Sequence, residues 1–185
     1  MALTKTPVCD FGKKAEDFKL KSIENKIISL NDVKGEKATL IMFICNHCPY
    51  VKAIIRDLAK DCNELKKDGI NSVAIMSNDT KNYPEDSFDN MIKFAKTNNF
   101  REINYLIDET QAVAKTYDAV CTPDFFGYNK NLELQYRGRI RELKNLKPVR
   151  NGKSDLKLAM QMIAKTQKGP LEQVSSMGCN IKWIK

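Results

Sequence analysis

Residues 38–51 read ATLIMFICNHCPYV and join a short apolar run to two cysteines three positions apart. The run 38–44 is rich in residues that favour strands and has the length of a buried strand. After Cys48 the pattern is helical, because apolar residues recur at steps of three and four as far as Leu65. We therefore predict a buried strand, a loop that carries two thiols, and an amphipathic helix.

Two thiols at the spacing of Cys45 and Cys48 can form and break a disulfide without moving the backbone. At a strand-to-helix junction, free N–H groups and the positive end of the helix dipole stabilise a thiolate. On this basis we predict Cys45 as the attacking thiol and Cys48 as the resolving thiol. His47 lies between them, and a partly charged imidazole there would stabilise the Cys45 thiolate. A solvent-facing histidine with no electrostatic role is the alternative.

A metal site is a competing interpretation of the cysteine pair, because spacing alone is a weak signal. Structural zinc needs a second pair of Cys or His ligands, and His47 is the only histidine in the chain. The remaining cysteines are isolated in sequence: Cys9, Cys62, Cys121 and Cys179. We therefore expect no metal and no cofactor. Cys62 fits the buried helix stripe, whereas Cys121 and Cys179 are candidate accessory thiols.

The length of 185 residues and the 42% hydrophobic composition predict one domain over 1–185, with a hairpin extension at 1–36 and a tail at 168–185. The chain has no apolar run of eighteen residues and no apolar leader, so we expect a soluble, cytoplasmic protein without a membrane partner. Cytoplasmic thiols favour transient disulfides. The net charge of +8 is concentrated at 137–157, without the interleaved aromatic residues that nucleic acid binding requires. A solvated loop is favoured there over a surface for an acidic partner.

The rest of the chain alternates between strand and helix patterns. We predict hairpins over 18–29 and 125–136 and strands at 72–76 and 105–107. We also predict a helix after Ser87 and a last helix from Ser154. Between them, Asp108 and Gln111 form a capping-box pattern for a short helix that ends at Tyr117. A strand, a helix and a second strand in succession imply parallel pairing. Near the C-terminus, Trp183 is expected to bury its ring.

The segment Cys121-Thr122-Pro123-Asp124 precedes the second hairpin. An X-Pro bond at a strand entry is a candidate cis peptide, which leaves backbone polar groups free to receive an extended partner. An ordinary turn with a trans proline is the alternative. With this element the order of segments resembles the thioredoxin fold, in which the cis-proline loop faces the dithiol. The resemblance implies an α/β protein of three α/β/α layers around a mixed central sheet, with an N-terminal β-hairpin extension.

Five motifs extend the resemblance over most of the chain: CNHCPYV at 45–51, YPEDS at 83–87, CTPD at 121–124, YRG at 136–138 and GCNIKW at 178–183. Together they resemble the peroxiredoxin-like branch of the redoxin (AhpC/TSA) superfamily. Two features of its better-known members are missing. Ile41 and Cys45 stand where peroxiredoxins have the proline and the Thr or Ser that polarise a peroxide, and Thr39 stands where thioredoxins have a buried acid.

The predicted function is a thiol:disulfide oxidoreductase with Cys45, Cys48 and His47 as catalytic residues. Asn46, Thr122 and Pro123 are the predicted substrate-binding residues. The expected partners are protein or small-molecule disulfides and an unidentified thiol electron donor. A thiol-dependent peroxidase is the enzymatic alternative, and a thioredoxin-fold binding module without catalysis is the alternative of another class.

Overall fold

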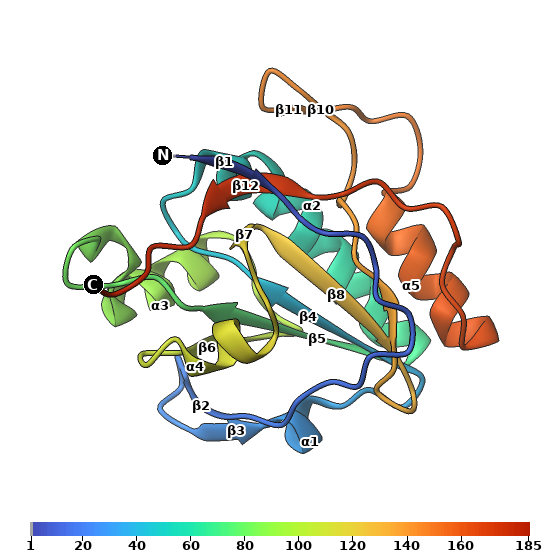
Figure 1. Ribbon diagram of the computed structural model, residues 1–185, viewed down its shortest axis with the longest axis horizontal. Helices are drawn as coiled ribbons and strands as arrows, with labels where there is room; N and C mark the ends of the chain where they lie inside the picture. The colour runs from blue at the N-terminus through green and yellow to red at the C-terminus, as the bar shows by residue number, and fades with distance from the viewer. Residues whose placement is uncertain (1) are drawn as a thin grey trace.

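A mixed sheet of seven strands forms the centre of the molecule. The computed structural model describes residues 2–185. The strands lie in the order β3 (Ile27–Ser29), β2 (Lys19–Ser22), β6 (Ile103–Ile107), β5 (Ile70–Met76), β4 (Ala38–Phe43), β8 (Asp124–Asn129) and β9 (Leu134–Tyr136). The three strands β4, β5 and β6 are parallel, and each outer neighbour runs antiparallel. The predicted N-terminal hairpin, β2 and β3, thus extends one edge of this sheet (Figure 1).

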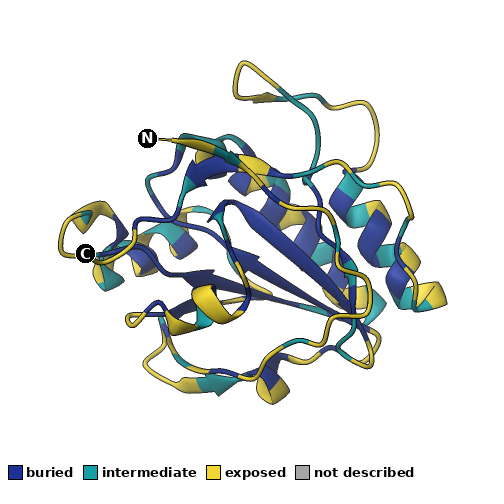
Figure 2. Cartoon of the chain, viewed as in Figure 1, coloured by how far each residue is buried: buried dark blue, intermediate teal, exposed yellow. Residues whose placement is uncertain are grey.

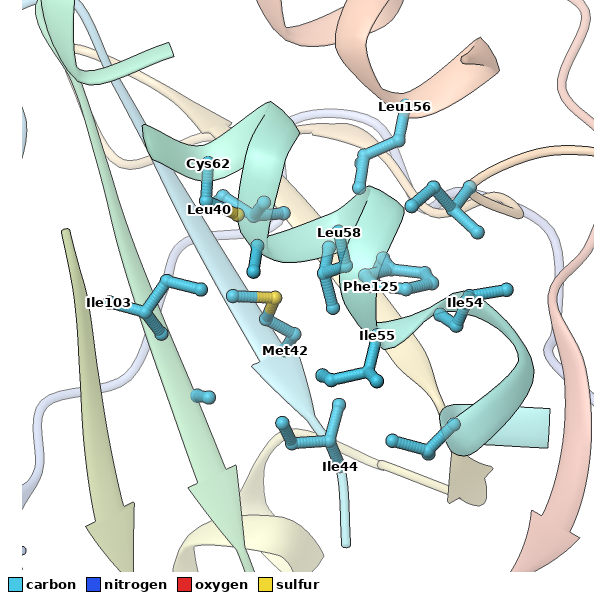
Figure 3. Packing of buried hydrophobic residues seen from close by; sticks show 14 of the residues in the cluster. Leu40, Met42, Ile44, Ile54, Ile55, Leu58, Cys62, Ile103, Phe125 and Leu156 are labelled. Atoms are coloured by element: carbon cyan, nitrogen blue, oxygen red, sulfur yellow. The ribbon is translucent and has the colours of Figure 1, made fainter. Parts of the chain in front are cut away.

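Helices cover both faces of the sheet, as Figure 1 shows. On one face lie α2 (Pro49–Leu65), α3 (Phe88–Thr97) and α5 (Asp155–Thr166), and on the other lie α1 (Leu30–Val33) and α4 (Ala112–Thr116). Side chains of β4 alternate between these layers: Leu40 and Met42 pack with α2, whereas Ile41 and Phe43 pack on the α1 and α4 side. Figure 3 shows the α2 side, and Figure 2 shows that the central strands are buried. The predicted three-layer α/β/α architecture is confirmed.

A second, smaller sheet joins the two ends of the chain. Strand β12 (Met177–Asn180) pairs antiparallel with β1 (Leu3–Lys5) on one side and with β7 (Cys121–Thr122) on the other. The Thr122–Pro123 peptide bond, directly after β7, is cis, as the sequence predicted. Strand β12 therefore pairs with Cys121 and Thr122, the segment whose backbone was predicted to receive an extended partner.

The approach of β12 to β7 depends on a glycine. An ideal Cβ built on Gly178 would lie 2.0 Å from the carbonyl oxygen of Thr122, a distance that no side chain tolerates. Glycine therefore permits the two backbones to approach each other in front of the cis-proline loop.

Shorter elements complete the chain. They are the 3-10 helices η1 (Lys66–Asp68) and η2 (Pro84–Asp86) and the hairpin of β10 (Leu143–Lys144) with β11 (Lys147–Pro148). Within residues 2–185, none of the helices is both long enough and apolar enough to cross a membrane.

Two local predictions were wrong. The short helix α4 begins after Gln111, which lies in the left-handed region at φ 63° and makes no side-chain cap. Asp108 instead reaches forward from the end of β6 and accepts a hydrogen bond of 2.9 Å from the N–H of Ala114, so it caps the helix without a capping box. Trp183 is 39% exposed, and the neighbouring Ile181 is buried in its place.

The basic segment 137–157 combines ion pairs with an exposed loop, because residues 144–147 and 150–153 are exposed, as the sequence predicted. Arg139 pairs with Asp155 at 2.7 Å, and Arg150 pairs with Asp57 of α2 at 3.1 Å. Lys157 on α5 contacts Glu64 on α2. Much of the positive charge that is prominent in the sequence is therefore neutralised within the chain.

Arg137 has a separate role, because it is buried. Its guanidinium donates to both carboxylate oxygens of Asp124, at 3.3 and 2.9 Å, and to the carbonyl oxygen of Asp118 at 2.8 Å. It also lies 4.4 Å from the centre of the Phe126 ring. Burial raises the pKa of the Asp124 carboxyl, and the hydrogen bonds from Arg137 partly offset this effect. The pair connects the start of β8 to the chain that leaves β9.

We predict that Arg137→Met lowers the free energy of unfolding by about 3–5 kcal/mol, because it leaves the Asp124 carboxylate buried without its partner. Denaturant unfolding measures the change. The matched control is Arg150→Met, which removes an arginine with a 64% exposed side chain and should cost less than about 1 kcal/mol. Equal losses in the two variants would contradict a structural role for the buried pair.

Candidate functional site

The two thiols lie in the loop between β4 and α2. Cys48 is the N-cap residue of α2, and Pro49 occupies the first turn, where a missing N–H costs nothing. Cys45 comes three residues earlier, outside the helix. Both residues are buried, with exposed fractions of 1% for Cys45 and 0% for Cys48. The sequence predicted Cys45 at the helix N-terminus, whereas the structure places Cys48 at that position.

Both sulfur atoms meet the cis-proline loop at Thr122. Cys45 Sγ lies 3.4 Å from the Thr122 hydroxyl, and the Cys48 thiol donates to the Thr122 carbonyl oxygen at 3.1 Å. The structure thus brings together Cys45, Cys48 and the Thr122–Pro123 segment, which lie more than seventy residues apart in sequence. Cys121 follows the expected alternation, because its thiol turns away to the Pro123 carbonyl oxygen at 3.6 Å.

Asp86 organises the dithiol loop from the neighbouring helix η2. One carboxylate oxygen accepts hydrogen bonds from the backbone N–H groups of Asn46, at 2.7 Å, and His47, at 3.3 Å. The other accepts from Asn78 Nδ2 at 2.8 Å and lies 2.7 Å from Nδ1 of the His47 ring. Three N–H groups thus donate to the two oxygens of a side chain that is fully buried.

Sequence reasoning did not assign a role to Asp86. The available signal was the YPEDS motif at 83–87, which supported the family resemblance without indicating any contact with the cysteines. The expected position of a buried acid is filled by Thr39, whose hydroxyl accepts a hydrogen bond from the Gly35 N–H at 3.0 Å. A buried acid is thus present at this site, but it comes from η2 rather than from β4.

His47 is held in a defined orientation. Its ring nitrogen Nδ1 lies 2.7 Å from a carboxylate oxygen of Asp86, which is hydrogen-bond distance. The Tyr83 ring stacks on the imidazole with centroids 5.6 Å apart and planes 6° apart. The His47 side chain is 13% exposed, so the histidine is not the free, solvent-facing side chain that the sequence left open.

Asn46 is also held by the chain itself. Its side chain accepts from the Tyr105 hydroxyl at 2.9 Å and donates to the Glu85 carbonyl oxygen at 3.2 Å. These contacts lock the loop onto β6 and η2. Its predicted contact with substrate remains a prediction.

Donor atoms of Cys45, His47 and Asp86 lie within 4.8 Å of one another, so these residues could in principle hold a metal ion. The two oxygens of Asp86 already accept hydrogen bonds from three N–H groups and also contact the His47 ring. A metal ion would have to displace the bond that orients His47. The donor set therefore fits a hydrogen-bonded relay better than a metal centre.

The two thiols of the pair differ in acidity. The pKa of Cys48 is lowered from 9.0 to about 5, first by the hydrogen bond from Cys45 and then by interactions with the backbone of Val51 and Cys179. The pKa of Cys45 is raised well above 9.0 by its hydrogen bond to Cys48, by burial and by the Asp86 charge. In the neutral form, the bond from Cys48 to the Thr122 carbonyl opposes ionisation. The directions of the two shifts make Cys48 the more acidic thiol of the reduced pair.

Cys179 is the third cysteine at this site. It lies directly opposite Thr122 in the pairing of β12 with β7, and its thiol interacts with that of Cys48. Burial and this interaction raise the pKa of Cys179 to about 11. Cys62 is buried in the α2 stripe, as predicted, and Cys9 is half-buried near the N-terminus.

A buried dithiol loop on the first parallel strand, a cis-proline loop facing it and three layers define a thioredoxin-like redoxin. The AhpC/TSA family profile matches residues 11–143, and this chain belongs to the AhpC/TSA family. A comparison with curated proteins gives no match.

Solved structures agree with this assignment. An uncharacterized conserved protein from Geobacillus kaustophilus is 38% identical, covering 100% of this chain and 97% of its own, with a TM-score of 0.93. A hypothetical protein from Sinorhizobium meliloti is 34% identical over 98% of both chains, with a TM-score of 0.89. The thioredoxin domain of a thiol-disulfide oxidoreductase from Bacteroides vulgatus is 19% identical over 73% of this chain and 89% of its own, with a TM-score of 0.58. At that identity the last similarity establishes the thioredoxin-like fold alone.

We predict that Asp86→Asn lowers the pKa of Cys45, because it removes a negative charge that disfavours the thiolate. It should also reduce the free energy of unfolding by about 1–3 kcal/mol, since a buried acceptor is weakened. His47→Gln is the companion variant, and loss of an imidazole that stabilises the Cys45 thiolate would raise the same pKa. Ultraviolet thiolate absorbance against pH measures both. An unchanged titration in both variants would contradict the electrostatic roles of these residues.

The acidity of the pair also predicts how stability depends on pH. Because the folded pKa of Cys48 is depressed to about 5 from 9.0, the unfolded chain binds the extra proton between these values. The stability of the reduced protein should therefore rise from about pH 5 to about pH 9 relative to Cys48→Ser. Above pH 9 the raised pKa of Cys45 acts in the opposite direction, and the gain should stop. Denaturant unfolding of the two proteins across this range measures the difference, and parallel curves would contradict the assignment.

Proposed function

We propose that the chain is a thiol:disulfide oxidoreductase that cycles Cys45 and Cys48 between a dithiol and a disulfide. The observation that carries the proposal is the convergence of both sulfurs on Thr122, next to the cis-proline bond. Protein or small-molecule disulfides are the substrates, and a thiol donor returns the electrons. Membership of the AhpC/TSA family supports the class of chemistry.

Cys45 is the attacking thiol in this mechanism, and Cys48 is the resolving thiol. As Cys45 Sγ attacks one sulfur of the substrate disulfide, the other substrate sulfur leaves and takes up the proton that Cys45 loses. Cys48 then attacks Cys45 Sγ, and the second substrate sulfur takes up the proton that Cys48 loses. The mixed disulfide breaks, the second substrate thiol leaves, and the chain holds a Cys45–Cys48 disulfide.

The Asp86–His47 pair lies next to Cys45, the attacking thiol. Asp86 fixes the orientation of the imidazole through its 2.7 Å contact with Nδ1. His47 is also the more exposed member of the Cys45, His47 and Asp86 set. We assign the attack to Cys45 because its sulfur lies within 4.8 Å of the donor atoms of His47 and Asp86, and His47 is the partly exposed residue of that set.

Substrate access requires movement in this site. With exposed fractions of 1% and 0%, neither sulfur can meet a substrate disulfide until neighbouring residues shift. A peroxide is smaller, but the chain lacks a residue that would help to activate it, because Ile41 replaces the proline of peroxiredoxins. Ile41 packs in the apolar layer on the α1 and α4 side of the sheet, whereas both cysteines belong to the α2 side.

The test is reaction with oxidised glutathione. The reduced wild-type protein should release both glutathione halves and acquire the Cys45–Cys48 disulfide, whereas Cys48→Ser should retain glutathione on Cys45. Mass spectrometry of acid-quenched samples identifies each product. Glutathione trapped on Cys48 in Cys45→Ser, but not on Cys45 in Cys48→Ser, would reverse the two roles. Failure to form the disulfide, together with fast consumption of hydrogen peroxide, would support the peroxidase instead.

A further inference from the structure

The strand β12 directs one side chain at the dithiol. Residues directly opposite each other in an antiparallel pair project to the same face of the sheet. Cys179 lies opposite Thr122, and the Thr122 hydroxyl is 3.4 Å from Cys45 Sγ. The side chain of Cys179 must therefore lie on the face that carries the dithiol. The next pair, Asn180 and Cys121, projects to the other face.

Burial and contacts agree with this register. Cys179 is 5% exposed and belongs to the same apolar cluster as Cys45 and Cys48. The Cys179 thiol interacts with the Cys48 thiol, and the Cys179 backbone also contacts Cys48. Since Gly178 permits the close approach of β12 to Thr122, the strand holds Cys179 at this position. Cys48 thus has a cysteine partner on either side.

We propose that Cys179 is a third redox-active thiol of this site, which exchanges with the Cys45–Cys48 disulfide to form a Cys48–Cys179 disulfide. The inference rests on the proposed function and extends it. It makes the C-terminal strand part of the redox centre. The cycle then has two oxidised forms, which differ in whether Cys45 is free.

The exchange step is balanced within the chain. The Cys179 thiolate attacks Cys48 Sγ, the Cys48–Cys179 bond forms, and the Cys45–Cys48 bond breaks. Cys45 leaves as a thiolate and takes up the proton that Cys179 has lost. Cys179 is oxidised and Cys45 is reduced in the same step, so no further oxidant or reductant is needed. The positive charge of Lys182 favours the Cys179 thiolate, against the burial that disfavours it.

The functional consequence is a free attacking thiol in the oxidised protein. With the disulfide moved to Cys48 and Cys179, Cys45 can react with another disulfide before an electron donor has reduced the chain. The oxidised pair is then held between the start of α2 and β12. A donor that reduces Cys48–Cys179 need not approach Cys45.

The first test uses the full-length Cys45→Ser variant, which keeps five of the six cysteines. After mild oxidation with diamide, acid quenching and alkylation, peptide mapping should find Cys48 linked to Cys179 in most chains. Cys9, Cys62 and Cys121 should remain free. The matched control is Cys45→Ser with Cys179→Ser, which should form no disulfide. Linkage of Cys48 to Cys121, or no linkage in a folded Cys45→Ser protein, would overturn the proposal.

The second test uses the wild-type protein and does not depend on that variant. Oxidised wild type should contain a fraction of chains with free Cys45 and protected Cys179 after acid quenching. Oxidised Cys179→Ser should contain no chains with free Cys45, because its only expected disulfide is Cys45–Cys48. Wild type with Cys179 always free would overturn the inference while leaving the proposed function intact. Absence of Cys45–Cys48 in both proteins would instead refute the proposed function.

Discussion

The buried carboxylate of Asp86 is the interaction on which the redox loop depends. The chain between β4 and α2 crosses the end of a fully buried strand, where backbone N–H groups have little access to water. Asp86 accepts from two of these groups, at Asn46 and His47, and also holds the His47 ring. An unpaired polar group in such a place would cost as much as a lost hydrogen bond. The conformation that presents both thiols to Thr122 therefore relies on a residue forty positions away.

The same carboxylate contributes to the difference in acidity between the two thiols. The pKa of Cys45 is raised first by its interaction with Cys48 and by burial, and then by the negative charge of Asp86, whereas Cys45 and the start of α2 lower the pKa of Cys48. The loop thus places a more acidic thiol and a less acidic thiol side by side at Thr122. The loop geometry and the electrostatics of the site consequently have a common origin.

Several motifs that are scattered in sequence meet around the cis-proline loop. Asp124, from the CTPD motif, pairs with Arg137 of the YRG motif. Gly178, from the C-terminal GCNIKW motif, lies against the Thr122 carbonyl oxygen. Each contact constrains the backbone on a different side of Pro123. The loop is therefore braced by the start of β8, by the chain after β9 and by β12, and this bracing orients Thr122 toward the thiols.

The sequence alone determined the elements whose signal is local. The apolar run 38–44, the three- and four-residue steps of α2 and the Thr-Pro pair predicted the strand, the helix and the cis peptide, because each depends on neighbours along the chain. The CNHC spacing likewise predicted a dithiol, and the motifs predicted the fold family. Only the tertiary structure decided how acidity is divided between the thiols, because that depends on Asp86 and on Cys48 being the N-cap residue. Only the tertiary structure placed Cys179 and Gly178 against Thr122, because strand register between distant segments is set by packing, which no local pattern records.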